Sequence, residues 1–247
     1  HTNDRRQRQM CIRDSLSPDI TMRLTIKTFH AFAAMILRES AAQLGLSPKF
    51  VICSEQDRLG LFRQAFPELE EKEAREFLAL ISTAKNVLHT ADMPDLADQY
   101  DAAFAEIYQQ YQAVLQKNQV LDFDDLILYA VQLLETYPET LQAYQSHFRW
   151  ISVDEYQDIN LAQYRLLRLL TASTETNLCV IGDPDQAIYG FRGAKREYFL
   201  QFQNDFPEAQ QMQLSQNYRS TQLILDASSQ VIEKDETQAH LEMWSCL

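Results

Sequence analysis

Two acidic residues follow a short apolar run near the middle of the chain. Residues 150–153 are nearly all apolar, which is typical of a β-strand covered on both faces, and Asp154 and Glu155 come directly after them. Ligands and catalytic groups of open α/β sheets gather at the carboxyl ends of strands. One carboxylate there can hold Mg²⁺ while the next deprotonates an attacking water. The same residues also suit a helix N-terminus, so the pattern alone leaves both interpretations open.

A second apolar run, residues 178–181, leads into a turn that contains Gln186. A glutamine at the end of a strand can contact a terminal phosphate or position a water, as it does in GTPases. Tyr189, Phe191 and Arg192 follow among glycines, a composition that suits a platform for stacking nucleic-acid bases. Each stacked base contributes about 1–3 kcal/mol and needs no basic surface.

A third β-prone run, residues 212–214, precedes Tyr218 and Arg219. A tyrosine beside an arginine offers a ring for a purine and a guanidinium group for a phosphate. An arginine at the end of a strand is also a common surface ion-pair partner, so this pair is a weak signal by itself. The three runs together predict strands whose carboxyl ends carry polar side chains.

The apolar spacing also predicts the elements that position these side chains. A helix over residues 161–170 separates the first two runs, and strand–helix–strand order predicts a parallel α/β sheet. Helical spacing covers residues 28–43, and residues 44–120 are helical in character. Within that stretch, the acids between residues 92 and 106 lie mostly off the apolar stripe, which indicates a solvated face over a helical core.

Acidic residues mark the start of a further helix at residues 121–127. Asp122 is a suitable N-cap, and Asp124 and Asp125 in the first turn are favourable for the helix dipole. Three carboxylates so close together could also bind a metal ion. Capping is the favoured interpretation.

Composition limits the functional classes. The 247 residues hold 22 Lys and Arg against 35 Asp and Glu, a net charge of −13, whereas nucleic-acid-binding surfaces are normally basic. DNA contact therefore needs a local patch or base stacking. Four scattered cysteines without a Cys-x-x-Cys pair argue against zinc and disulfides and indicate a reducing, cytoplasmic location. No apolar run reaches the roughly 18 residues of a membrane span, so no membrane partner is expected.

Three segments, residues 153–158, 181–194 and 216–221, strongly resemble motifs II, III and IV of superfamily 1 DNA helicases of the UvrD/Rep type. Two upstream segments resemble further motifs of that family. They are Thr-Phe-His-Ala-Phe at residues 28–32 and Leu-Asp-Phe-Asp-Asp-Leu at residues 121–126. Several linked motifs in the expected order make the resemblance highly specific.

The resemblance covers about residues 24–230 and implies an α/β fold: a partial RecA-like parallel sheet, domain 1A, with an inserted all-helical domain, 1B. Residues 1–15 include Met-Cys-Ile-Arg-Asp-Ser, which the transposon-end adaptor of DNA libraries can encode, so we interpret them as a non-native leader. Residues 234–247 are expected to be a truncated tail. The implied motor domain takes residues 16–44 and 119–233, and the implied helical insertion takes residues 45–118.

The resemblance implies roles for the matching residues. Asp154 would coordinate the Mg²⁺ of Mg-ATP, and Glu155 would be the general base for the hydrolytic water. Gln186 would contact the γ-phosphate, Tyr218 would stack on adenine, and Arg219 would act as an arginine finger. The implied contacts to single-stranded DNA are Thr28, His30, Tyr189, Phe191 and Arg192. The family more often carries Trp at position 191 and Ser at position 187, where this chain has Phe and Ala.

One motif of the family is missing. A P-loop, Gly-x-x-x-x-Gly-Lys-Ser/Thr, holds the ATP phosphates in this family, but no Gly-Lys pair occurs in the chain. Motifs of a second motor domain do not follow residue 230 either. An arginine finger alone contributes about 10³–10⁵ in rate. We therefore expect part of an ATP-dependent 3′→5′ DNA helicase or translocase of DNA repair or replication, inactive as this fragment. Its expected partners are ATP with Mg²⁺, single-stranded DNA and repair proteins.

Three alternatives stay open. The chain could be a non-catalytic module that binds single-stranded DNA or protein. It could be a fragment of a recombination helicase–nuclease, because such enzymes share these motifs. It could also be a metal-dependent hydrolase built on the acids at residues 122–125 and 154–158, which is disfavoured because each cluster has a better explanation.

Overall fold

The computed structural model describes residues 24–173, 175–187, 190, 193–232 and 244–245. The predicted non-native leader, residues 1–15, lies outside these residues, as does most of the predicted tail. Tyr189, Phe191 and Arg192, which are predicted to contact DNA, also lie outside them.

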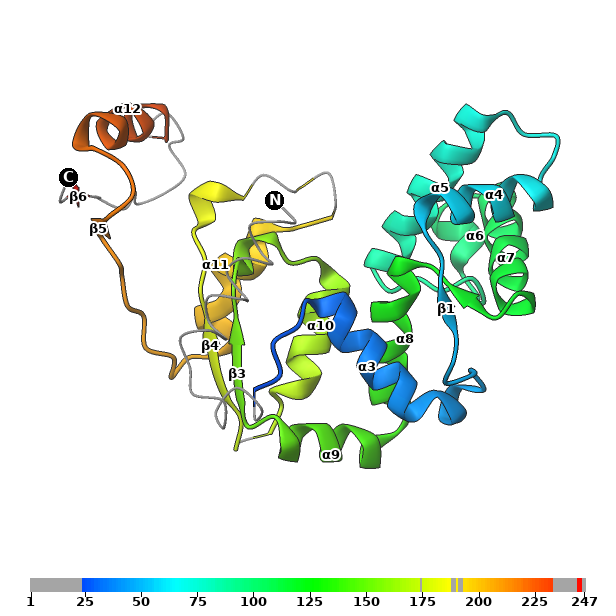
Figure 1. The fold of residues 1–247 in the computed structure, drawn as a ribbon, viewed down its shortest axis with the longest axis horizontal. Coiled ribbons are helices and arrows are strands. Elements are labelled where there is room, and N and C mark those ends of the chain that lie inside the picture. The colour runs from blue at the N-terminus through cyan, green and yellow to red at the C-terminus, as the bar shows by residue number, and fades with distance from the viewer. Residues whose placement is uncertain (1–23, 174, 188–189, 191–192, 233–243, 246–247) are drawn as a thin grey trace.

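The fold is mainly helical with short parallel strands, in agreement with the predicted α/β class (Figure 1). The described strands are β1 (Val51–Ile52), β2 (Val120–Leu121), β3 (Trp150–Val153), β4 (Asn177–Val180), β5 (Gln216–Asn217) and β6 (Trp244–Ser245). The described α-helices are α3 (Phe29–Ser40), α4 (Glu55–Ala65), α5 (Glu71–Asn86), α6 (Leu96–Gln99), α7 (Ala102–Lys117), α8 (Phe123–Thr136), α9 (Pro138–His147), α10 (Leu161–Leu170), α11 (Arg196–Asp205) and α12 (Gln222–Ile232). Short 3₁₀ helices are η1 (Ala41–Leu44), η2 (Tyr156–Asp158) and η3 (Pro184–Gln186). The strands pair in parallel as β1–β2, β3–β4 and β5–β6.

Side-chain caps set the starts of several helices. The hydroxyl of Thr28 accepts a hydrogen bond from the Ala31 amide at 3.2 Å and caps α3. Asp122 and Asp125 form a reciprocal capping box at the start of α8, with bonds of 2.9 and 3.1 Å. The predicted cap at Asp122 is therefore confirmed. The predicted bounds of α10 are also confirmed, and the helix predicted at 28–43 is α3 followed by η1.

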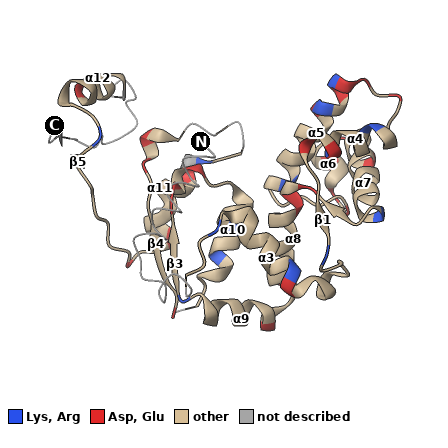
Figure 2. Ribbon diagram, in the orientation of Figure 1, with Lys and Arg blue, Asp and Glu red and all other residues tan. Residues whose placement is uncertain are grey.

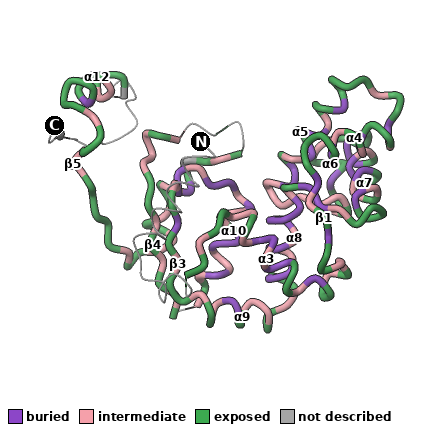
Figure 3. The backbone as a smooth tube through the Cα atoms, in the orientation of Figure 1, coloured by how far each residue is buried: buried purple, intermediate pink, exposed green. Residues whose placement is uncertain are grey.

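One hydrophobic cluster forms around α8 (Figure 3). This helix packs against α3 and α10, and α9 closes the cluster at one side. Because α8 has neighbours on several sides, most of its residues are buried. Fully buried members of the cluster include Ile36, Leu37, Leu126, Leu133 and Leu134.

Helices α4 to α7, here called the helical unit, form a second cluster of their own. The helical character expected for residues 44–120 is confirmed, and α7 buries Phe104, Tyr108, Tyr111 and Leu115 in this cluster. Acidic and basic residues are interleaved on the outside of α4 and α5 (Figure 2). β1 leads into the helical unit and β2 leads out of it, with Val51 opposite Val120. Buried members of the cluster include Phe62, Ile81, Phe104, Tyr108, Tyr111 and Leu115.

The β3–β4 sheet is covered on one face. Ile151 and Val153 point to the face on which α10 and α11 pack, together with Val180. Trp150 points the other way and is 79% exposed. The expectation of strands covered on both faces is therefore wrong for the described part of the chain. Both covering helices contact the same alternate side chains, which leaves the intervening side chains in solvent.

Residues 212–214 do not form the third strand that the sequence predicts. Met212 and Leu214 are each 88% exposed, and this segment pairs with no strand among the described residues. β5 begins at Gln216 and pairs with β6, apart from the β3–β4 sheet (Figure 1). β propensity reflects packing on a pleated surface, so an apolar run without a neighbouring strand or a packed face gains nothing from it.

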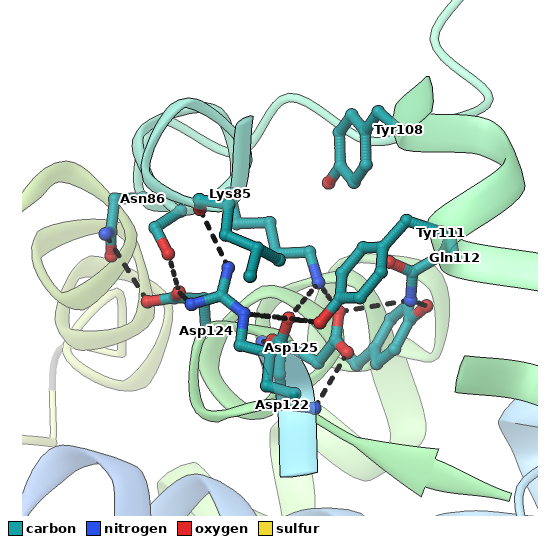
Figure 4. A network of polar contacts seen from close by, with 12 residues as sticks. Lys85, Asn86, Tyr108, Tyr111, Gln112, Asp122, Asp124 and Asp125 are labelled. Atoms are coloured by element: carbon teal, nitrogen blue, oxygen red, sulfur yellow. Dashed lines mark hydrogen bonds and ion pairs between the residues drawn. The ribbon is translucent and has the colours of Figure 1, made fainter. Parts of the chain in front are cut away.

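A buried charge network joins the helical unit to α8 (Figure 4). This junction network comprises Arg58, Lys85, Tyr111, Asp122 and Asp125. The Lys85 ammonium lies 2.7 Å from a carboxylate oxygen of each aspartate. Arg58 donates to the Tyr111 hydroxyl at 3.2 Å, and that hydroxyl donates to Asp122 at 3.0 Å. The lysine and both aspartates are almost completely buried, so each charge depends on its partners.

The junction network shifts the pKa values of its two aspartates in opposite directions. Burial by itself raises the pKa of Asp122, but Lys85 and Arg58 outweigh burial and lower that pKa to about 2. Burial and then the charge of Asp122 raise the pKa of Asp125 to about 7, although Lys85 opposes the shift. Asp122 therefore stays ionised to a lower pH than Asp125 does.

Replacement of the buried ammonium group is expected to be strongly destabilising. Lys85→Met leaves two buried carboxylates without their shared cation, so the free energy of unfolding should fall by about 3–5 kcal/mol in a urea titration. Lys72→Met is the matched control, because Lys72 is exposed and lies 4.0 Å from Glu76. Its effect should stay within about 0.5 kcal/mol. Equal effects of the two substitutions would contradict the role given to the junction network.

The raised pKa of Asp125 predicts a loss of stability with rising pH. Between pH 4 and pH 7 the folded chain holds a proton on Asp125 that the unfolded chain has released, so the free energy of unfolding falls as pH rises through this window. Asp125→Asn removes this titration and should flatten the profile. Urea unfolding at pH 5, 6, 7 and 8 tests the prediction. Parallel profiles for the two proteins would overturn it.

Candidate functional site

The predicted catalytic segments meet at one edge of the β3–β4 sheet. The two strands are parallel and in register, with Val153 opposite Val180, so their carboxyl ends point to the same side. The Ile181 amide donates to the Val153 carbonyl at 2.8 Å, and the Tyr156 amide donates to the Ile181 carbonyl at 3.0 Å. Asp154 and Glu155 therefore lie beside the turn that follows β4.

Glu155 has an unusual backbone conformation. Its φ of +55° lies in the left-handed region, which costs energy for a residue with a side chain. This conformation ends β3 sharply and starts η2, where the Asp158 amide donates to the Glu155 carbonyl at 2.9 Å. The amide of Glu155 donates to the Asp154 carboxylate at 3.1 Å. In the turn after β3, the left-handed conformation falls on the residue predicted to be the general base.

Gln157 connects the two turns, and the sequence analysis did not single it out. It is 1% exposed, its side-chain amide donates to the Glu155 carboxylate at 2.8 Å, and its side-chain oxygen accepts from the Asp183 amide at 3.1 Å. A Cβ atom on Gly182 would come within 2.5 Å of that oxygen, so only glycine fits there. The sequence signal that could have identified Gln157 is its place between acidic residues directly after the apolar run at residues 150–153.

Gln186 lies at the end of η3 and is held to the same turn. Its side-chain amide donates to the Asp183 carboxylate at 2.6 Å, and the Asp185 amide donates to the other carboxylate oxygen at 3.0 Å. The predicted phosphate-contact residue is exposed. The structure thus brings Gln186 to the same edge as Asp154 and Glu155.

Tyr218 and Arg219 lie elsewhere. They follow β5, which sits with α12 apart from the β3–β4 sheet (Figure 1). Tyr218 is 70% exposed and donates to the Gln216 side chain at 2.5 Å, and the Arg219 amide donates to Asn217 at 2.8 Å. The structure does not bring these two predicted ATP contacts to the edge that carries Glu155.

The described part of the predicted DNA surface lies at the start of α3. The Thr28 side chain is exposed and its hydroxyl caps the helix. His30 is partly buried, with its ring edge-on to Phe123 at 5.6 Å between centroids. Burial lowers the pKa of His30, and the charge of Asp124 opposes this only in part. His30 therefore favours the neutral form, which offers a hydrogen bond without a charge.

The acids of the two predicted clusters serve different purposes. In the described part of the chain, no group of three or more His, Cys, Asp or Glu is placed to hold a metal ion. Asp122 and Asp125 bind Lys85 and cap α8, which disfavours the metal-dependent hydrolase. At the β3 edge, Asp154 is exposed, and a carboxylate is a donor type that fits Mg²⁺ with waters and substrate phosphates in its shell.

No helix among the described residues is long and apolar enough to cross a membrane.

Comparison with known proteins identifies a matching family model and several relatives. Residues 5–207 match the family model of the UvrD/REP helicase N-terminal domain. An ATP-dependent DNA helicase PcrA of Leuconostoc citreum is 40% identical over 236 residues, which cover 93% of this chain and 31% of that protein. Proteins of the same name from Staphylococcus aureus and Staphylococcus epidermidis are 41% identical over 226 residues, or 89% of this chain and 31% of theirs.

The matched region covers most of this chain but a smaller share of each relative. The chain spans about a third of the length of the curated relatives it matches. The family match, in contrast, covers most of the chain and includes β3, β4 and the turns that follow them. The chain therefore belongs to the UvrD/REP helicase N-terminal domain family.

Proposed function

We propose that the chain is part of an ATP-dependent 3′→5′ DNA helicase or translocase that acts in DNA repair or replication in the cytoplasm, with repair proteins as partners. The observation that carries this proposal is the meeting of Asp154, Glu155 and the Gln186 turn at one edge of a parallel sheet. Phosphoryl transfer needs a metal ligand, a base for the water and a contact to the transferred phosphate in such an arrangement. The family match supports the same conclusion.

Asp154, Glu155 and Gln186 would each perform a different part of ATP hydrolysis. Asp154 would hold Mg²⁺, which would neutralise negative charge on the phosphates of ATP. Glu155 orients the attacking water and takes its proton. Gln186 contacts the γ-phosphate, while Tyr218 and Arg219 act on adenine and phosphate once the β5 segment is brought to the site. Their position in Figure 1 requires that movement.

The division of the chain into domains is also a proposal. The motor domain takes residues 16–44 and 119–233, and residues 45–118 form the inserted domain 1B. The separate hydrophobic cluster of the helical unit supports this division. So do the adjacent strands β1 and β2, through which the chain enters and leaves the unit.

Single-stranded DNA is proposed to contact the start of α3 and the aromatic residues of segment 189–192. Thr28 and His30 provide polar contacts, and Tyr189 and Phe191 provide stacking surfaces, with Arg192 for the backbone. Stacking explains how an acidic chain can bind DNA, because it depends on aromatic area and not on net charge. DNA binding without catalysis is the second candidate function of the isolated chain.

The isolated chain is expected not to turn over ATP. Without a Gly-Lys pair, no P-loop can hold the phosphates, so phosphate release from Mg-ATP should stay at background with and without single-stranded DNA. Glu155→Gln, and Glu139→Gln as an exposed control outside the site, should match the wild-type chain. DNA-stimulated turnover that Glu155→Gln alone abolishes would show that the remaining motifs hold ATP by themselves.

Affinity for an oligo-dT strand should depend on the salt concentration and on the aromatic side chains of segment 189–192. Phe191→Ala should weaken binding by about 1–3 kcal/mol, roughly fivefold to 150-fold, in a fluorescence anisotropy titration. Affinity should also fall with added salt, because the phosphate contact of Arg192 releases counterions. Trp150→Ala is the control, since Trp150 is an exposed aromatic at the far end of β3. Oligo-dT binding that changes with neither salt nor Phe191→Ala would contradict the proposed DNA surface.

A further inference from the structure

We propose that Gln157 is a positioning residue that ties the carboxylate of Glu155 to the turn carrying Gln186. The inference rests on the proposed roles of Glu155 and Gln186. It adds a physical connection through which movement of the phosphate-contact turn reaches the general base. Gln157 itself does not touch substrate.

The side chain of Gln157 replaces a missing backbone partner. The β3–β4 ladder continues past the strands through two bonds, Ile181 to Val153 and Tyr156 to Ile181. The left-handed turn at Glu155 then diverts the chain, and the next amide, that of Asp183, donates to the side-chain oxygen of Gln157. A side-chain carbonyl thus extends the ladder by one bond where the backbone has turned away.

The two ends of the Gln157 amide have different partners, which fixes its orientation. The oxygen accepts from a backbone N–H group, and the nitrogen donates to the Glu155 carboxylate at 2.8 Å. A flipped amide would place donor against donor and acceptor against acceptor. The side chain is buried, and its oxygen lies close to Gly182, so the surrounding atoms restrict its movement. The amide is therefore held in a single arrangement.

The connection continues to Gln186. Asp183 donates its amide to Gln157 and accepts at its carboxylate from the Gln186 side chain at 2.6 Å. Three hydrogen bonds therefore lead from Gln186 through Asp183 and Gln157 to Glu155. Because the middle of this path is buried, a displacement of the η3 turn changes the position of the Glu155 carboxylate.

The first test measures amide hydrogen exchange by NMR in the full chain, without ATP or DNA. Gln157→Leu should speed exchange of the Asp183 amide about fivefold to tenfold relative to the Ile181 amide, since it removes one hydrogen bond. Gln145→Leu is the matched control, because Gln145 donates to the Leu169 carbonyl at 2.7 Å and joins α9 to α10. It should leave that ratio unchanged. An unchanged ratio in Gln157→Leu would overturn the proposal.

The second test measures whether a change at Gln186 reaches the carboxylate of Glu155 through Gln157. A side chain with a merely structural role would not transmit such a change. Gln186→Ala should shift the side-chain carboxyl signal of Glu155 in the wild-type background and not in the Gln157→Leu background. Gln157→Met removes both bonds while keeping the length of the side chain, so Asp183 should lose protection and transmission should be lost, as in Gln157→Leu. A Glu155 response that persists in both Gln157 variants would overturn the proposal.

These readouts are independent of the proposed function. The absence of ATP hydrolysis or of DNA binding would not change the expected results of the exchange and transmission tests. Failure of the exchange or transmission tests in a chain that still binds single-stranded DNA would remove the role of Gln157 alone.

Discussion

Two aspartates at the start of α8 share one buried ammonium group, and both halves of the fold depend on that arrangement. Asp122 and Asp125 belong to the central helix of the main core, whereas Lys85 comes from α5 of the helical unit. A lysine without exposed surface is stable only when it is paired. The same two carboxylates cap α8, so one pair of side chains both starts a helix and binds its neighbour.

The junction network extends toward the candidate site through a set of amide contacts. Asp124 accepts from the Ser82 hydroxyl at 2.6 Å and from the Asn86 side chain at 3.4 Å (Figure 4). Asn86 in turn accepts from the side chain of Asn160 at 2.6 Å, and Asn160 caps α10 at the end of the turn after β3. The helical unit is therefore bonded to the segment that carries Glu155, as well as joined to the main core by β1 and β2.

Local patterns predicted the elements whose determinants lie within one or two turns of chain. The bounds of α10 and the cap at Asp122 were predicted because apolar spacing and capping act over three or four residues. The strand predicted at residues 212–214 was wrong, because a strand needs a neighbour that the run itself does not specify. The expected cover on both faces of β3 failed for a related reason, since cover depends on where α10 and α11 pack.

The sequence by itself determined the family, the chemical types at the ends of β3 and β4, and the absence of a Gly-Lys pair. It did not determine which side chains those acids would bind. Lys85 reaches Asp122 across 37 residues, and Gln157 reaches the Asp183 amide across 26 residues. Such pairs form only when separate elements pack, because hydrogen bonds and ion pairs act over a few ångströms and spacing along the chain does not specify distance in space. Tertiary structure therefore decided that Asp122 and Asp125 pair with Lys85 and that Glu155 pairs with Gln157.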